Sequence, residues 1–252
     1  MKLAIMQPYF FPYLGYFQLI NSVDKFILYE NLSFRKESWM TRNRILAVKA
    51  NPLFIHVPIK SKSSYKKISE IKIVDDKKWK ETLKKNIYFN YKNSKYYNGI
   101  FPSLEKIIDT KTDSLHTFNS TAICNLAKLL GIDTKIDFVN SQYLKLENDL
   151  KLKFEINDLD NPFQTLKRKT ERIILITKQE NANVFINPIG GTTLYSKTEF
   201  AQCSIDLFFL QTKDYFYRQS SRVFFRDLSI IDVLLNCGID NTKDLLNQFD
   251  LI

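Results

Sequence analysis

The first 29 residues, MKLAIMQPYFFPYLGYFQLINSVDKFILY (Met1–Tyr29), decide the fold. Lys2–Met6 is a short apolar run that ends before Pro8, which is typical of a buried strand. Apolar residues at helical spacing cover residues 12–22, and a second β-branched and aromatic run covers Lys25–Tyr29. A strand, a short helix and a strand in so few residues predict a βαβ unit with parallel strands and a right-handed crossover.

Helical and strand patterns alternate through most of the remaining chain. The pattern predicts an α/β fold with a mainly parallel sheet flanked by helices, built as a single domain from residue 1 to residue 252. The polar stretch 140–162 is predicted to be a mobile loop or a small, irregular helical lobe. Strands are expected at 45–60, 68–74, 136–139, 184–186 and 205–209, and helices at 76–91, 113–130 with Asp113 as its cap, 165–180 and 229–236.

The composition excludes several classes of site. Lys and Arg total 37 against 27 Asp and Glu, and the resulting net charge of +10 favours an anionic partner. The six glycines form neither G-x-G-x-x-G nor G-x-x-x-x-G-K-[ST], so both glycine-rich phosphate loops are excluded. Two distant histidines and three cysteines without C-x-x-C argue against a zinc site, and no metal or cofactor is expected. With no signal or membrane-spanning pattern, we expect a cytoplasmic protein.

The segment after the first strand is the first candidate site. In an open α/β sheet, ligands bind beyond the carboxyl ends of the strands, which is where Gln7, Tyr9, Tyr13 and Gly15 would lie. The following helix N-terminus favours an anion, and the aromatic rings could hold a base or a sugar. A hydrophobic plug beneath the helix is an equally good interpretation.

The second candidate is Trp39-Met-Thr-Arg42-Asn43-Arg44. Two arginines with an aromatic neighbour suit phosphate pairing and stacking, and on a strand both arginines would share one face. Arginines that pair with surface carboxylates are the equally weighted alternative. Lys60 begins a Ser/Lys-rich loop that is typical of a solvated turn, and it is kept as a candidate for binding an anion.

The third candidate is Asn187-Pro-Ile-Gly190-Gly191, with Tyr195 downstream. Its Gly-Gly pair follows a predicted strand, so its backbone could approach a ligand closely, although a plain tight turn explains it as well.

The C-terminal candidates are Tyr217, Gln219, Ser229 and Asp232. Asp232 lies in the first turn of a helix, where a carboxylate is stabilised in any case, or it acts as a base. His56 in a strand is the other candidate base, and His116 is expected to be exposed on its helix.

Together these segments resemble the WbqC-like protein family. MQPYFFPYLGYFQLI, VDKFILYEN, W-x-x-RNRI, INPIGG, Y-x-Q and LSIIDVL occur in the family's order over the whole chain. The chain departs from the family at Asn31 and Ser33, where the family often has an acidic residue and a Gln. The resemblance implies a Rossmann-like layer similar to nucleotidylyltransferases, but the loop after the first strand lacks their paired histidines, which argues against nucleotidyl transfer.

The resemblance also implies a role in bacterial surface-polysaccharide (O-antigen) biosynthesis. The leading hypothesis is a transferase that acylates, or glycylates, the amine of a nucleotide-linked amino sugar, with the donor on an acidic acyl or aminoacyl carrier protein. Arg42, Asn43 and Arg44 would hold a diphosphate, Asp232 or His56 would take the proton, and the glycine amides would bind the oxyanion. The alternatives are a non-catalytic component that binds nucleotide sugars or carrier proteins, and a protein that binds aminoacyl-tRNA.

Overall fold

A computed structural model describes residues 1–48, 51–61, 65–74, 76–154 and 162–252. Its centre is a six-stranded sheet in the order β5-β2-β1-β6-β7-β8, in which the first five strands are parallel and β8 runs antiparallel to β7. The predicted mainly parallel α/β sheet is therefore confirmed. The strands are β1 (Lys2–Met6), β2 (Lys25–Leu28), β5 (Lys135–Asp137), β6 (Val184–Pro188), β7 (Asp206–Thr212) and β8 (Phe249–Leu251).

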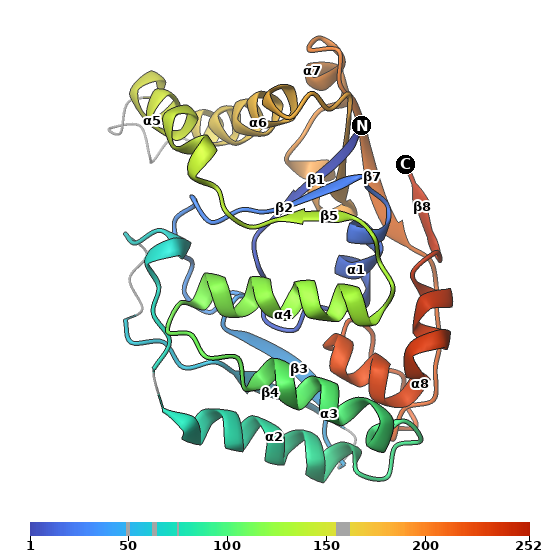
Figure 1. Ribbon diagram of the computed structural model, residues 1–252. Helices are drawn as coiled ribbons and strands as arrows, with labels where there is room; N and C mark the ends of the chain where they lie inside the picture. The colour runs from blue at the N-terminus through green and yellow to red at the C-terminus, as the bar shows by residue number, and fades with distance from the viewer. Residues whose placement is uncertain (49–50, 62–64, 75, 155–161) are drawn as a thin grey trace.

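Helices cover both faces of the sheet (Figure 1). Alternate side chains of β1 point to opposite faces: Leu3 and Ile5 join the cluster under α6, and Ala4 joins the larger cluster with α1 and α4. One face carries α5 (Leu144–Lys153), α6 (Pro162–Gln179) and α7 (Lys197–Ala201); the other carries α1 (Leu14–Asn21), α4 (Leu115–Leu129) and α8 (Ile230–Leu245).

A further layer lies beyond α4 and α8. It consists of α2 (Lys77–Tyr91), α3 (Tyr97–Ile108) and a two-stranded hairpin, β3 (Arg42–Leu46) with β4 (Pro52–His56). The N-terminal βαβ prediction is confirmed, because α1 connects β1 to β2 in parallel register from Leu3↔Lys25 to Met6↔Leu28.

Two strand predictions are wrong. Residues 45–60 do not form one strand, because the chain turns back where Ala47 N donates to Asn51 O, and the pairing is antiparallel. Residues 68–74 form a 3-10 turn, Ile68–Glu70, followed by isolated bridges, so they are not a strand.

Two helix predictions also change. Ser114, not Asp113, caps α4, with its hydroxyl accepting from Thr117 N at 3.3 Å. Helix α8 does not end at Gly238: this residue kinks the chain at φ 81°, and helical structure resumes to Leu245. Helix α3 was not predicted at all.

The stretch predicted as a loop or lobe at 140–162 is helical where the structure describes it. A 3-10 turn at Ser141–Tyr143 leads into α5, which packs against α6. Residues 155–161 lie outside the described residues. Among the described helices, none has the length and apolar character required to cross a membrane.

Candidate functional site

The parallel sheet changes winding direction between β1 and β6. From β1 the chain crosses to β2 on one side, whereas from β6 it crosses to β7 on the other side. Ligands of open α/β sheets bind at such a switch point, beyond the carboxyl ends of the strands. Gln7 follows β1 and Asn187 lies near the end of β6, so the structure places both at this edge.

Buried side chains fix the backbone of the loop after β1. The Asn43 amide donates to the carbonyls of Phe10 and Phe11 at 3.0 and 2.7 Å, and Ser229 Oγ donates to Phe11 O at 2.8 Å. Asn119 donates to an earlier carbonyl of the same loop at 2.9 Å. Phe11 has a φ of 42°, a costly conformation for this residue that these bonds hold in place. The sequence made Asn43 and Ser229 candidates for binding substrate, but both are buried and hold the loop.

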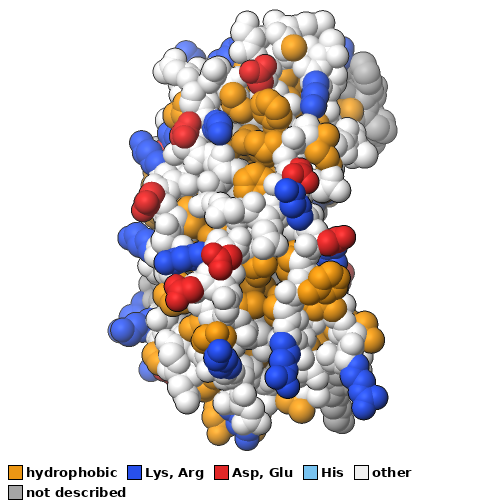
Figure 2. Space-filling model, turned by 90° about the vertical axis from the view of Figure 1, so that its right-hand side faces the viewer, with side chains coloured by type: hydrophobic (Ala, Val, Ile, Leu, Met, Phe, Trp, Pro, Cys, Tyr) orange, Lys and Arg blue, Asp and Glu red, His pale blue; other side chains and the backbone are white. Residues whose placement is uncertain are grey.

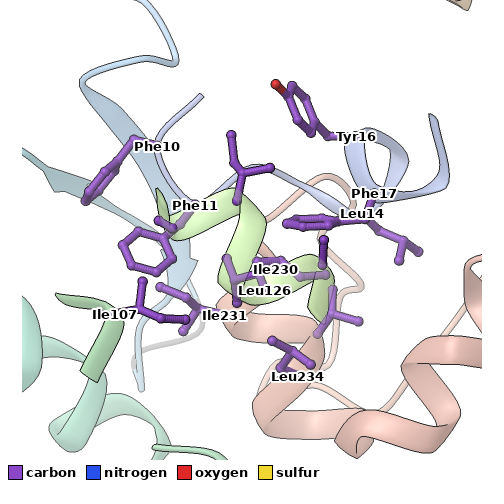
Figure 3. Close-up of a cluster of buried hydrophobic side chains, with 14 of the residues drawn as sticks. Phe10, Phe11, Leu14, Tyr16, Phe17, Ile107, Leu126, Ile230, Ile231 and Leu234 are labelled. Carbon is purple, nitrogen blue, oxygen red and sulfur yellow. The ribbon is translucent and has the colours of Figure 1, made fainter. Parts of the chain in front are cut away.

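The loop is a buried plug in one part and has accessible side chains in another. Phe10 and Phe11 are fully buried and point into the core, as a plug would (Figure 3). Gln7 and Tyr9 are half-buried at the edge and remain accessible. Tyr9 is also near Arg35, which lowers its pKa against the larger raising effect of burial.

Tyr13 and Gly15 belong to the packing of α1. A Cβ on Gly15 would lie 2.6 Å from the ring of Tyr13, so glycine is required for this close contact. Burial raises the pKa of Tyr13, with smaller contributions from Tyr9 and Asp227.

The end of β6 supplies the other side of the edge. Asn187 is 9% exposed, and a Cβ on Gly191 would lie 1.8 Å from its amide nitrogen, whereas Gly190 faces open space. Tyr195 packs edge-on against Phe185; burial raises its pKa and nearby Arg172 lowers it. The predicted Gly-Gly turn is therefore a 3-10 turn, Ile189–Thr193, with only its first glycine open.

Helix α6 brings three cations close to this edge, and the sequence did not identify them. Arg172 is buried and donates to both oxygens of Glu147, at 2.5 and 3.0 Å. Lys169 is half-buried, and its pKa is lowered first by burial and then by Arg35 and Arg172. Burial and Arg172 likewise lower the pKa of Arg168. The run Lys167-Arg-Lys-Thr-Glu-Arg172 was the available signal, but on an amphipathic helix it looks like a solvated face.

His116 and Glu30 form a pair at the carboxyl end of β2. His116 is only 5% exposed, so the prediction of an exposed histidine is wrong; the first half of α4 is packed on nearly all sides. Its Nε2 donates to Phe138 O at 2.7 Å and lies 3.4 Å from Glu30 Oε2. The Glu30 side chain keeps 19% exposure, and Asn140 accepts a hydrogen bond from the Glu30 backbone. A carboxylate that remains accessible in this way can accept a proton.

The WbqC-like protein family profile matches residues 7–244 of this sequence. The chain belongs to the WbqC-like protein family. An uncharacterized protein of Mycobacterium tuberculosis, Rv1507c, is 25% identical over 241 residues, which is 95% of each chain. No solved structure matches the chain significantly. The region that matches the family includes the loop after β1, the Glu30–His116 pair and the cations of α6.

The hairpin of this WbqC-like protein places the second set of candidates away from the edge. Arg42 and Arg44 share the exposed face of β3, as predicted, opposite His56 and Phe54 on β4. The Arg42 guanidinium lies 5.2 Å from the Phe54 ring centroid, and Arg44 lies 5.6 Å from that of Trp39. A pocket of about 110 Å³ beside them includes Arg42 and His56 but neither Gln7 nor Asn187. Lys60 is exposed in the loop that follows.

Asp232 connects layers of this fold through hydrogen bonds. Its carboxylate accepts hydrogen bonds from Tyr91 at 2.5 Å, Tyr217 at 2.6 Å and Gln219 at 3.3 Å, and it is fully buried. Burial raises the pKa of Asp232, and these hydrogen bonds oppose the rise. With both oxygens occupied by protein donors, it is placed to tie α8 to α2 and to the segment after β7. His56 lies on the exposed face of the hairpin, so the two expected bases are not brought together.

Within the described residues, no three His, Cys, Asp or Glu side chains gather as metal ligands would.

Proposed function

We propose that this WbqC-like protein is a transferase of surface-polysaccharide (O-antigen) biosynthesis that acylates the amine of a nucleotide-linked amino sugar, with glycyl as one candidate group. The observation that carries the proposal is the loop after β1, whose backbone is held by buried side chains at the switch point. It presents Gln7 and Tyr9 at the edge where open α/β sheets bind ligands, with Arg35 near both Tyr9 and Lys169 of α6. A nucleotide sugar offers the phosphates, rings and hydroxyls that such a set of side chains would bind.

The chemistry requires one proton acceptor and no redox partner. The amine nitrogen of the sugar attacks the carbonyl carbon of an activated acyl donor, a thioester or an ester. The bond from that carbon to the donor sulfur or oxygen breaks, and the leaving group departs with the electron pair. We assign the proton released by the nitrogen to Glu30, whose carboxylate lies 3.4 Å from His116 Nε2. The open backbone at Gly190 is the candidate for binding the oxyanion.

The hairpin favours a specific kind of donor. Its two arginines lie against aromatic rings, an arrangement typical of surfaces that stack bases and bind phosphates. This supports an aminoacyl-tRNA as the donor over an acidic carrier protein. Binding of tRNA should then fall steeply with added salt and should weaken in Arg44→Ala. A carrier protein that binds unchanged in Arg44→Ala, with no tRNA binding, would reverse this preference.

A thermal-shift screen tests the proposed acceptor. The protein is heated with UDP-, dTDP- and GDP-linked 3-amino and 4-amino sugars, with the matching hydroxy sugars and free nucleotides as controls. Saturation at a hundredfold excess over Kd should stabilise the protein by about 2.7 kcal/mol. A larger shift for one amino sugar than for its hydroxy analogue supports the proposal, and equal shifts or none contradict it.

The variant Glu30→Gln separates an enzyme from a binding protein of the same pathway. It removes the proton acceptor and keeps the shape of the side chain, so binding of the amino sugar should persist while acyl transfer is lost. Transfer that survives in Glu30→Gln would contradict the assignment of Glu30.

A further inference from the structure

We infer that Arg35, Arg168 and Lys169 form the binding site for the phosphate groups of a nucleoside diphosphate. The inference names the subsite within the proposed function and rests on it for the identity of the rest of the ligand.

Charge balance around α6 is the first argument. Glu147 is the carboxylate that raises the pKa of Arg168, and it is already occupied: Arg172 binds both of its oxygens, and Tyr29 Oη donates to it at 2.6 Å. Glu171, on the same helix, pairs with Lys153 at 2.6 Å. Arg168 and Lys169 have no ion-pair partner in the part of the chain that the structure describes. The Arg168 Nε is buried there without a hydrogen-bond acceptor.

The second argument is that like charges converge here from separate elements. Arg35 comes from the loop after β2, and Lys169 comes from the first half of α6, yet Arg35 is close enough to lower the pKa of Lys169. Arg35 is exposed, whereas Arg168 and Lys169 are half-buried, and holding half-buried cations near a further cation costs free energy unless an anion neutralises them. Phosphate groups supply that charge, and guanidinium groups bind them with good geometry.

Two other partly buried cations of the molecule, Lys25 and Lys84, are neutralised, in contrast to Arg168 and Lys169. Lys25 pairs with Asp137 at 2.6 Å and with Glu180 at 2.5 Å, and Lys84 pairs with Glu81 at 2.8 Å. On the side of the molecule that carries α8 and β8, lysines and arginines are dispersed among acidic and apolar side chains (Figure 2). The excess of positive charge is therefore not concentrated on that side.

The position of the cluster indicates how the ligand lies. Arg35 is near Tyr9, and Arg172 is near Tyr195, so the cations adjoin the aromatic residues of both strand ends at the switch point. With its phosphates on Arg35, Arg168 and Lys169, the ligand directs its sugar or base toward the rings of Tyr9 and Tyr195.

Calorimetric titration of the full chain with UDP, pyrophosphate and uridine tests the site. Wild type should bind UDP and pyrophosphate more tightly than uridine. Lys169→Met and Arg168→Gln should each weaken both phosphate ligands about tenfold or more, because each removes a charged hydrogen-bond donor. Lys169→Arg should restore most of the affinity.

The matched control is Lys178→Met, which removes an exposed lysine from the last turn of the same helix. Its affinity for both ligands should stay within about twofold of wild type. The thermal midpoint of every variant shows that it is folded. Equal losses in Lys169→Met and Lys178→Met, or no binding of pyrophosphate and UDP by wild type, would overturn the inference.

The same titrations distinguish failure of the site from failure of the proposed function. If UDP and pyrophosphate bind through Lys169 but no amino sugar is preferred over its hydroxy analogue, the phosphate site stands and the acceptor proposal fails. If an amino sugar binds equally well to wild type and Lys169→Met, the acceptor proposal stands and the phosphate site is wrong.

Discussion

Asp232 and Lys169 are both charged groups removed from water, but their surroundings differ. Asp232 is fully buried, and protein donors occupy both of its oxygens. Lys169 is half-buried beside Arg35 and Arg172, with no acidic partner among the described residues. A satisfied buried charge contributes to the architecture, whereas an unsatisfied one has a free energy that a ligand can lower. The comparison therefore separates residues that build this fold from the residues that we propose to bind a ligand.

The largest expected effect is on stability in Asp232→Ala. The substitution leaves the hydroxyls of Tyr91 and Tyr217 without their acceptor and opens a cavity, so we expect a loss of about 3–5 kcal/mol in the free energy of unfolding. Urea denaturation followed by circular dichroism measures it. A variant as stable as wild type would break the comparison, because Asp232 would then not be structural.

A pair of glycine variants tests the edge backbone at the next level of effect. In Gly191→Ala the new Cβ would collide with the amide of Asn187, so the site must distort at a cost of about 1–3 kcal/mol. Gly190→Ala adds its methyl group to open space and should change stability by less than about 1 kcal/mol. Thermal unfolding of both proteins checks this, and equal losses would contradict the close contact at Gly191.

A smaller effect is expected in the pH dependence of stability. Because the pKa of Asp232 is raised in the folded state, the folded protein holds this proton more tightly than the unfolded chain does. Its contribution to stability is thus present below the ordinary carboxyl pKa of about 4 and is lost as pH rises through the folded value.

Asp232→Asn removes this titration and tests the sign. The free energy of unfolding of wild type should fall relative to that of Asp232→Asn as pH rises from about 4 to 7. Urea midpoints across that range measure the difference, and an opposite slope would show that the hydrogen bonds outweigh burial at Asp232.

The smallest expected effect is a gain in stability in Lys169→Met. Removing a half-buried cation that faces two arginines relieves repulsion, so the ligand-free protein should become more stable by a few tenths of a kcal/mol. Chemical denaturation in low salt, where repulsion is least screened, is the appropriate measurement. A destabilised variant would place Lys169 with Asp232 among the structural charges.

The N-terminal half of the sheet could be predicted because its signals are local. The apolar residues of the strand Lys2–Met6 and of the helix after it follow patterns that show which face of each element is buried. Helix α3 was missed because Gly99 and Pro102 are residue types that commonly mark turns between elements. Its stability comes from contacts with α8 and α4 that no local pattern reveals.

The site was predicted in part for a similar reason. The segment at Gln7 and the turn at Gly190 follow strands, and the rule about carboxyl ends located both. The cations of α6 and the pair formed by Glu30 and His116 depend on chain crossings between distant elements, so the sequence shows only ordinary helix residues. The motif residues Asn43 and Ser229 were interpreted as ligand contacts. The sequence alone does not distinguish a polar residue that shapes a site from one that binds a ligand.

The bond from Ser229 to the loop also sets an order of events during synthesis. Ser229 donates to Phe11 O across 218 residues of sequence, so the loop cannot take its final form until the last part of the chain has left the ribosome. At typical rates of translation this delay is on the order of ten seconds or more, during which a nascent chain exposes the aromatic residues of the loop. A product truncated before Ser229 would carry most of the sheet and lack this bond to the loop.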